Sequence, residues 1–145
     1  MRYILVINSR NNETNNKKLE DAIVRVASED PDLKSRLEFR YTEYPGHAAD
    51  VALEADEKYK GSVAVVACGG DGTIQEVANG IYGHENAILG VVPVGSGNDL
   101  VRQLGRDRNS RERYRRLPDQ LDGMITRMDL IRMSWIEQGE EKTCM

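Results

Sequence analysis

The chain has 145 residues, a formal net charge of −4 at pH 7 and two cysteines. This length is typical of one domain with its own core, and the weak negative charge gives no general case for nucleic-acid binding. Two cysteines exclude a disulfide framework or a zinc site, and no apolar run approaches the roughly 18 residues of a membrane span. We therefore expect a soluble, cytoplasmic protein that binds no nucleic acid.

The chain opens with a strand pattern followed by a helix pattern. An apolar run at residues 3–7 predicts a strand that ends at Asn8, and the polar residues 8–16 predict a loop. Apolar residues at helical spacing over residues 19–27 predict a helix, which we expect the Asp-Pro pair at residues 30–31 to stop.

The next two elements repeat this order. Residues 37–42 alternate between apolar and polar side chains, which predicts a half-exposed strand near the sheet edge, ending at Thr42. A Pro-Gly turn at residues 45–46 then leads to residues 47–59, whose apolar positions predict an amphipathic helix.

A glycine turn follows the apolar strand pattern of residues 63–67. Its glycines are Gly69, Gly70 and Gly72. Glycines lack the Cβ atom that keeps a ligand away from the backbone amides. We expect Thr73 to cap the next helix and Glu76, three residues later, to complete a capping box.

A helix that begins at a glycine turn offers N–H groups and a partial positive charge to an anion. The turn therefore predicts a phosphate site, with a tight turn that binds nothing as the alternative. Asp71 at the tip of this turn would repel phosphate unless a cation or a hydroxyl donor came with the ligand, and this favours a magnesium nucleotide.

The same order recurs with a strand at residues 87–92, a glycine turn at residues 93–97 and a helix at residues 98–104. Strands that alternate with helices predict a layered α-β-α sandwich with a mainly parallel sheet. Ligands bind outside the carboxyl ends of such strands, so we expect Asn8, Thr42 and both glycine turns to meet at one crevice.

Arginines dominate residues 102–116, which predicts either a solvated helix face or a basic patch for phosphates or an anionic membrane. Residues 117–125 suggest a short helix, and residues 128–136 a strand that leads into a turn at residues 138–140. We expect the chain to end before a partner strand is complete, so that pairing between two chains would make a homodimer.

Common catalytic motifs are missing from both turns. Neither continues as the dinucleotide fingerprint, neither is followed by a Walker lysine, and Val94 stands where a nucleophile elbow needs glycine. The two histidines, His47 and His84, are expected in non-catalytic positions.

Three segments carry a resemblance to a known family. They are residues 42–48 (TEYPGHA), residues 69–81 (GGDGTIQEVANGI) and residues 93–102 (PVGSGNDLVR). In this order, and with Asn8 at the end of the first strand, they resemble the catalytic domain of the diacylglycerol kinase family, which includes sphingosine kinases and bacterial lipid kinases. The GGDGT element alone (residues 69–73) also occurs in NAD kinases and phosphofructokinases, so an NAD kinase-like enzyme is an alternative.

The resemblance implies a Rossmann-like or phosphofructokinase-like domain that transfers the γ-phosphoryl group of ATP, with Mg²⁺, to a diacylglycerol or sphingoid-base-like lipid, and that works at a peripheral membrane surface. Asp71 resembles the aspartate assigned as the base in sphingosine kinases, with a structural or metal-linked role as the alternative. No residue is assigned as a protein ligand to a metal. The implied nucleotide-site residues are Asn8, Thr42, Gly69, Gly70, Gly72, Thr73, Glu76, Gly95, Ser96, Gly97 and Asn98.

The sequence departs from the family pattern at two places. After Asn8, residues 9–12 (SRNN) stand where the family continues N-P-x-S-G, without its proline or glycine, and Gln75 stands where the family has asparagine. The family also adds a β-rich lipid-binding domain, so we expect the nucleotide-binding domain at residues 1–126 and the start of a truncated second domain at residues 127–145. A non-catalytic nucleotide-binding or dimerising module is therefore a further alternative.

Overall fold

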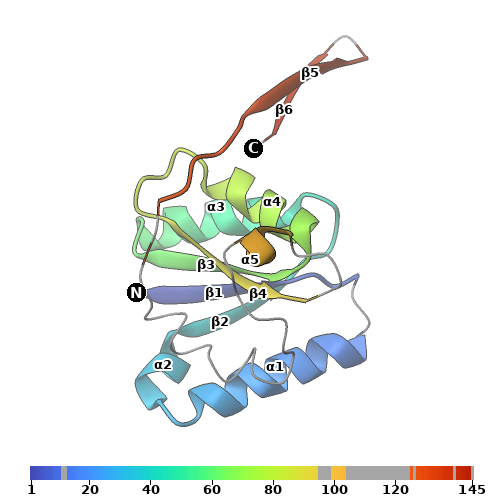
Figure 1. Ribbon diagram of the computed structural model, residues 1–145. Helices are drawn as coiled ribbons and strands as arrows, with labels where there is room; N and C mark the ends of the chain where they lie inside the picture. Colours follow the sequence, from blue (N-terminus) through green and yellow to red (C-terminus); the bar gives the residue numbers. More distant parts are fainter. Residues whose placement is uncertain (11–12, 95–98, 104–124, 126, 139, 145) are drawn as a thin grey trace.

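The computed structural model describes residues 1–10, 13–94, 99–103, 125, 127–138 and 140–144 (Figure 1). Four parallel strands form the main sheet in the order β2-β1-β3-β4. They are β1 (Arg2–Ile7), β2 (Leu37–Tyr41), β3 (Val63–Gly69) and β4 (Ile88–Pro93). The helices around them are α1 (Glu13–Ala27), α2 (Pro31–Arg36), α3 (His47–Tyr59), α4 (Asp71–Ile81) and α5 (Asp99–Gln103).

Helices cover both faces of this sheet, with α1 and α2 on one side and α3 and α4 on the other (Figure 1). Alternate residues of each strand point to opposite faces. In β1, Leu5 packs in the core under α1 and α2, whereas Ile4 and Val6 pack in the core under α3 and α4. The predicted α-β-α sandwich is confirmed.

Burial follows the position of each strand in the sheet. All seven residues of β3 are buried, as are all residues of β1 after Arg2, because both strands lie in the interior of the sheet. Four of the five residues of β2 are only half-buried, and Tyr41 is exposed. The prediction of a strand near the sheet edge at residues 37–42 is confirmed.

In the first part of the chain one predicted boundary is wrong and one helix was not predicted. The helix α1 begins at Glu13, inside the segment expected to be a loop. The Asp-Pro pair at residues 30–31 does follow α1, but it also starts α2, which was not predicted. The Asp30 carboxylate accepts hydrogen bonds from the N–H groups of Asp32 and Leu33, and Pro31 occupies the first turn, where its missing N–H costs nothing.

The predicted capping box at Thr73 is also wrong. The helix α4 begins at Asp71 with Gly70 at the N-cap, so Thr73 lies inside the first turn. The Glu76 carboxylate accepts a hydrogen bond from the N–H of Ala48, at the start of α3. The two side chains therefore bond to other segments and not to each other's backbone.

The C-terminal part of the described chain forms a two-stranded antiparallel hairpin, which Figure 1 shows extending away from the main sheet. Its strands are β5 (Met133–Glu137) and β6 (Glu140–Cys144). The expectation of an unpaired strand is wrong, because Trp135 pairs with Lys142 within the same chain. The strand also begins at Met133, later than predicted, while the turn at Gln138 is where it was expected.

Two predicted features lie largely outside the described residues. They are the helix at residues 117–125, of which only Ile125 is described, and most of the arginine-rich run at residues 102–116. Among the helices that the structure describes, none has the length and apolar character needed to cross a membrane.

Candidate functional site

Hydrogen bonds between neighbouring strands continue one residue beyond the strands themselves. The Thr42 N–H donates to the Ile7 carbonyl at 3.0 Å, and the Asn8 N–H donates to the Cys68 carbonyl at 3.4 Å. On the other side of β3, the Val94 N–H donates to the Gly69 carbonyl at 3.0 Å. The carboxyl ends of the four strands are therefore held in line, and together they form one edge of the sheet.

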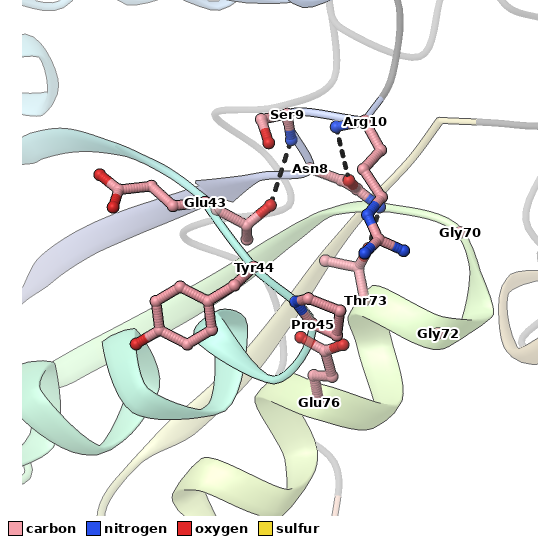
Figure 2. A pocket seen from close by; sticks show the side chains of 11 residues that line it. Asn8, Ser9, Arg10, Glu43, Tyr44, Pro45, Gly70, Gly72, Thr73 and Glu76 are labelled. Carbon is pink, nitrogen blue, oxygen red and sulfur yellow. Dashed lines mark hydrogen bonds between the residues drawn. The ribbon is translucent and has the colours of Figure 1, made fainter.

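A pocket of about 250 Å³ opens at this edge. The chain adds β2 on one side of β1 and then adds β3 on the other side of β1. The pocket lies at this change in the direction in which strands are added. This is the topological switch point at which doubly wound sheets bind ligands. The residues that line it are Asn8, Ser9, Arg10, Thr42, Glu43, Tyr44, Pro45, Gly70, Gly72, Thr73 and Glu76 (Figure 2).

Asn8 connects the loop after β1 to the first turn of α4. Its side-chain Nδ2 donates to the Thr73 hydroxyl at 3.3 Å, and its Oδ1 accepts from the Arg10 N–H at 2.9 Å. The Asn8 carbonyl also accepts from the side-chain amide of Asn16 in α1 at 3.1 Å. Both polar atoms of the Asn8 side chain are thus engaged inside the protein.

Thr42 connects the same loop to the end of β2. Its side chain is buried, and its hydroxyl accepts a hydrogen bond from the Ser9 N–H at 3.1 Å. Asn8, Thr42 and Thr73 come from three different strand ends, so the structure brings these three predicted residues together as expected.

The segment between β2 and α3 forms another wall of the pocket. The Glu43 N–H donates to Nδ1 of His47 at 2.9 Å, and the Tyr44 ring stacks on the His47 ring with centroids 4.4 Å apart. Gly46 has φ +89°, which is the left-handed backbone conformation that glycine adopts most easily. His47 thus fixes the shape of this turn.

The three glycines of the first turn have different surroundings. A Cβ atom at Gly69 would lie 2.4 Å from the Thr73 hydroxyl oxygen, so Gly69 permits close packing beneath Thr73 and does not itself line the pocket. At Gly72 a Cβ would meet nothing within 4 Å, and at Gly70 only the Val94 carbonyl at 4.0 Å. The backbone at Gly70 and Gly72 is therefore open to a ligand.

Asp71 lies between these two open glycines, but its carboxylate bonds to another helix. Its Oδ1 accepts a hydrogen bond from the Asp99 N–H at 2.8 Å, at the start of α5. Gly95, Ser96, Gly97 and Asn98 lie outside the described residues. The residues that flank them, Val94 and Asp99, bond to Gly69 and Asp71, so both of these described residues lie beside the first turn.

Five residues of the pocket lining were not predicted. They are Ser9, Arg10, Glu43, Tyr44 and Pro45. Each follows a predicted strand end by one to three residues, and that position was the available signal. In the described part of the chain, no group of three or more histidine, cysteine or acidic side chains is placed to hold a metal ion.

The fold and the pocket define a doubly wound α/β domain with its candidate site at the switch point of a parallel sheet. Comparison with known families adds a more specific assignment, because residues 2–133 match the diacylglycerol kinase catalytic domain. The chain belongs to the diacylglycerol kinase catalytic domain family. The resemblance that the sequence motifs indicated is confirmed.

Individual relatives are lipid kinases by name. The chain is 55% identical over 42 residues to a diacylglycerol kinase of Bacillus subtilis, a match that covers 28% of this chain and 14% of the relative. It is 41% identical over 73 residues to sphingoid long chain base kinase 5 of Saccharomyces cerevisiae, which covers 44% of this chain and 10% of the relative.

A solved structure shares the fold. The crystal structure of a diacylglycerol kinase from Bacillus anthracis superposes with a TM-score of 0.63 at 25% identity, over 79% of this chain and 40% of that one. In each of these comparisons the match spans less than half of the relative.

Proposed function

We propose that this chain is the nucleotide-binding domain of a lipid kinase that transfers the γ-phosphoryl group of ATP to a lipid hydroxyl. The observation that supports this most directly is the pocket at the switch point, where the open glycine turn meets Asn8 and Thr42. Family membership supports it independently.

The pocket has the features that a phosphate chain requires. Gly70 and Gly72 leave open space above the first turn of α4, where a triphosphate would lie along backbone N–H groups that are outside the helical ladder. Thr73, although buried, reaches the pocket wall with its hydroxyl. These residues fit a nucleotide, so we retain Gly70, Gly72 and Thr73 as nucleotide-site residues.

Mg²⁺ usually binds through one or two carboxylates plus the phosphates of the nucleotide. Glu76 lines the pocket and Asp71 stands at its turn, so these two carboxylates are the described groups that could share a magnesium ion with the phosphates. When bound, the ion would offset the negative charge of the transferring phosphoryl group.

Asp71 is the proposed base that orients the lipid hydroxyl, although its hydrogen bond to the Asp99 N–H also gives it a structural role. Asp71→Asn distinguishes the two roles. Asparagine keeps an oxygen that can accept this hydrogen bond, but it has no basic carboxylate.

The names of the relatives suggest diacylglycerol or a sphingoid base as the lipid. Residues 127–145 would then begin a second, β-rich domain. The proposal also includes contact with an anionic membrane through the arginine-rich run, which vesicle co-sedimentation tests. It includes homodimerisation as well, which analytical ultracentrifugation tests.

The test is transfer of labelled γ-phosphate by the full-length product of the reading frame, with diacylglycerol, sphingosine and NAD as acceptors. We expect labelled lipid from the wild type and a loss of at least 100-fold in Asp71→Asn, the scale of general acid–base catalysis. Equal rates in both proteins would remove Asp71 as the base. Labelled NAD without labelled lipid, or no transfer at all, would overturn the lipid kinase.

A further inference from the structure

We propose that Arg10 binds the phosphate chain of the nucleotide, and that Asn8 and Thr42 are positioning residues that hold the Arg10 loop in place. The inference rests on the proposed function and adds a specific cation to it. Neither motif spacing nor the comparisons single out Arg10, which lies in the loop that departs from the family pattern.

The charge of the pocket favours a protein cation in addition to the magnesium ion that the phosphates would bring. Glu76 lines it and Asp71 lies at the adjoining turn, so a triphosphate would enter beside two carboxylates. Glu43 also belongs to the lining, but its carboxylate points away from the glycine turn (Figure 2). Like charges at short range repel, and the partial charge of a helix N-terminus is only about half an elementary charge. Among the described residues of the lining, Arg10 is the one cation.

Hydrogen bonds fix the backbone of Arg10 relative to the glycine turn. The Ser9 N–H donates to the buried Thr42 hydroxyl at 3.1 Å, and the Arg10 N–H donates to Asn8 Oδ1 at 2.9 Å. The same Asn8 side chain donates to Thr73 in the first turn of α4. The loop is thus tied to the ends of β2 and β3 at once.

The Arg10 side chain extends from this loop toward the first turn of α4, where Thr73 lies (Figure 2). It is exposed, so its guanidinium is accessible to a ligand that enters the pocket. A guanidinium presents several N–H donors in a planar fork that matches two phosphate oxygens at once. This geometry suits the β- or γ-phosphate of a nucleotide that lies along Gly70 and Gly72.

Asn8 therefore has a positioning role toward Arg10. Both polar atoms of its side chain already bond within the protein, to the Arg10 N–H and the Thr73 hydroxyl. Removing this side chain would release the loop and leave the guanidinium without a fixed position.

The experiment is titration calorimetry of the 145-residue chain with Mg-ATP and with adenosine, comparing the wild type with Arg10→Gln, Arg10→Lys and Arg25→Gln. Arg25 is the matched control because it is exposed in the last turn of α1 and is not part of the pocket lining. Circular dichroism melting checks that each variant remains folded.

We expect Arg10→Gln to weaken Mg-ATP binding by about 10- to 100-fold, the range for hydrogen bonds to charged groups. Adenosine binding should change by less than about twofold, because adenosine has no phosphate to lose contact with. Arg10→Lys should be intermediate, and Arg25→Gln should bind like the wild type. In a double-mutant cycle, Asn8→Ala should weaken the wild type but add little to Arg10→Gln.

Equal Mg-ATP affinity in the wild type and Arg10→Gln would overturn the inference and leave the proposed function standing. An equal loss for Mg-ATP and adenosine would also overturn it, because the defect would not concern phosphate. The last comparison is the binding of the wild type and Arg10→Gln to phosphatidylglycerol vesicles. If Arg10→Gln loses vesicle binding but keeps Mg-ATP binding, Arg10 binds a lipid phosphate and the inference is overturned. A wild type that binds no Mg-ATP would instead contradict the proposed function itself.

Discussion

Gly69 and Gly72 belong to the same glycine turn, yet the structure gives them different roles. Gly69 is the last residue of β3 and packs against the Thr73 side chain, whereas Gly72 lies in the first turn of α4 and faces open space. A sequence motif treats these glycines alike. Their substitution by alanine should therefore separate stability from ligand binding.

Gly69→Ala should destabilise the fold. Its Cβ would lie 2.4 Å from the Thr73 hydroxyl oxygen, so Thr73 would have to move and its bond from Asn8 would be strained. Overpacking of this kind costs about 1–3 kcal/mol in the free energy of unfolding, which urea denaturation measures. A variant as stable as the wild type would show that this contact does not constrain the turn.

Gly72→Ala should leave the fold intact and impair the site. No atom lies within 4 Å of the new methyl group, and alanine is the better helix former, so stability should stay within about 1 kcal/mol of the wild type. If phosphates lie over this turn, the methyl group will weaken Mg-ATP binding by at least about tenfold, or 1.4 kcal/mol. Unchanged affinity in calorimetry would place the phosphates elsewhere.

Thr73 and Glu76 show what residue-level reasoning could predict. The sequence pattern correctly placed both residues at the start of a helix and beside the pocket. It assigned the wrong hydrogen bonds, because the partners of these side chains, Asn8 and Ala48, are distant in sequence. A local motif contains no information about such contacts.

At the scale of elements, α3 and α4 pack closely side by side on one face of the sheet (Figure 1). The close approach occurs at Gly80, where a Cβ would lie 2.3 Å from the Ala49 carbonyl oxygen and 2.8 Å from the Ala52 Cβ. Backbone atoms of α3 thus occupy the space that a side chain on α4 would need.

Gly80→Ala should force the two helices apart. The steric cost of about 1–3 kcal/mol should exceed the gain in helix propensity of about 1 kcal/mol, so the free energy of unfolding should fall. Gln75→Ala, at an exposed position of the same helix, is the matched control and should be nearly neutral. A stabilised Gly80→Ala protein in thermal melts would contradict this packing.

The edge strand β2 is joined to α3 by charged groups around Glu38. Partial burial raises the pKa of Glu38, but the Tyr59 hydroxyl, Lys58 and Arg40 together outweigh it and lower the pKa below its ordinary value of 4.5. The Tyr59 hydroxyl donates to Glu38 at 3.0 Å, and the Lys58 ammonium lies 3.5 Å away. The folded protein therefore favours the carboxylate form.

This lowered pKa predicts a pH dependence of stability. The Glu38 contribution is present above pH 4.5 and is lost as the pH falls through the lower pKa of the folded state, because the protonated group no longer pairs with its partners. Glu38→Gln should cost about 0.2–1 kcal/mol at pH 7, and the difference should shrink in acid. Urea denaturation of the wild type and Glu38→Gln, at pH 7 and at a pH below the folded-state pKa of Glu38, checks this. A stability difference between the two proteins that does not change with pH would disprove the role given to the Glu38 carboxylate.

Sequence patterns predicted the four strands of the main sheet and the helices α1, α3 and α4 but missed α2 and the partner strand β6. Apolar patterns identified β1 and β3 because both faces of these strands are buried, and they identified α3 because one face of this helix is buried. The helix α2 has six residues and one buried side chain, Leu33, so it has almost no periodicity to detect. Its only signal was Asp30 with Pro31, which is equally consistent with the end of α1.

For the whole molecule, the strand order β2-β1-β3-β4 determines where a ligand can bind. It brings together Asn8, Thr42 and Thr73, which are far apart in the sequence. Parallel strands alone predicted that these ends share one edge. The sequence did not reveal the hydrogen-bonded loop of Ser9 and Arg10, because its conformation depends on side chains from two other strand ends.

The central claim is that a nucleotide binds at this edge of the sheet, and amide NMR of the labelled chain during a Mg-ATP titration tests it most directly. The predicted result is saturable shifts at the pocket residues, with Arg25 and Lys58 unaffected. The pocket residues to follow are Ser9, Arg10, Thr42, Gly70, Gly72 and Thr73. Spectra that do not change with Mg-ATP, or shifts centred on the β5–β6 hairpin, would contradict it.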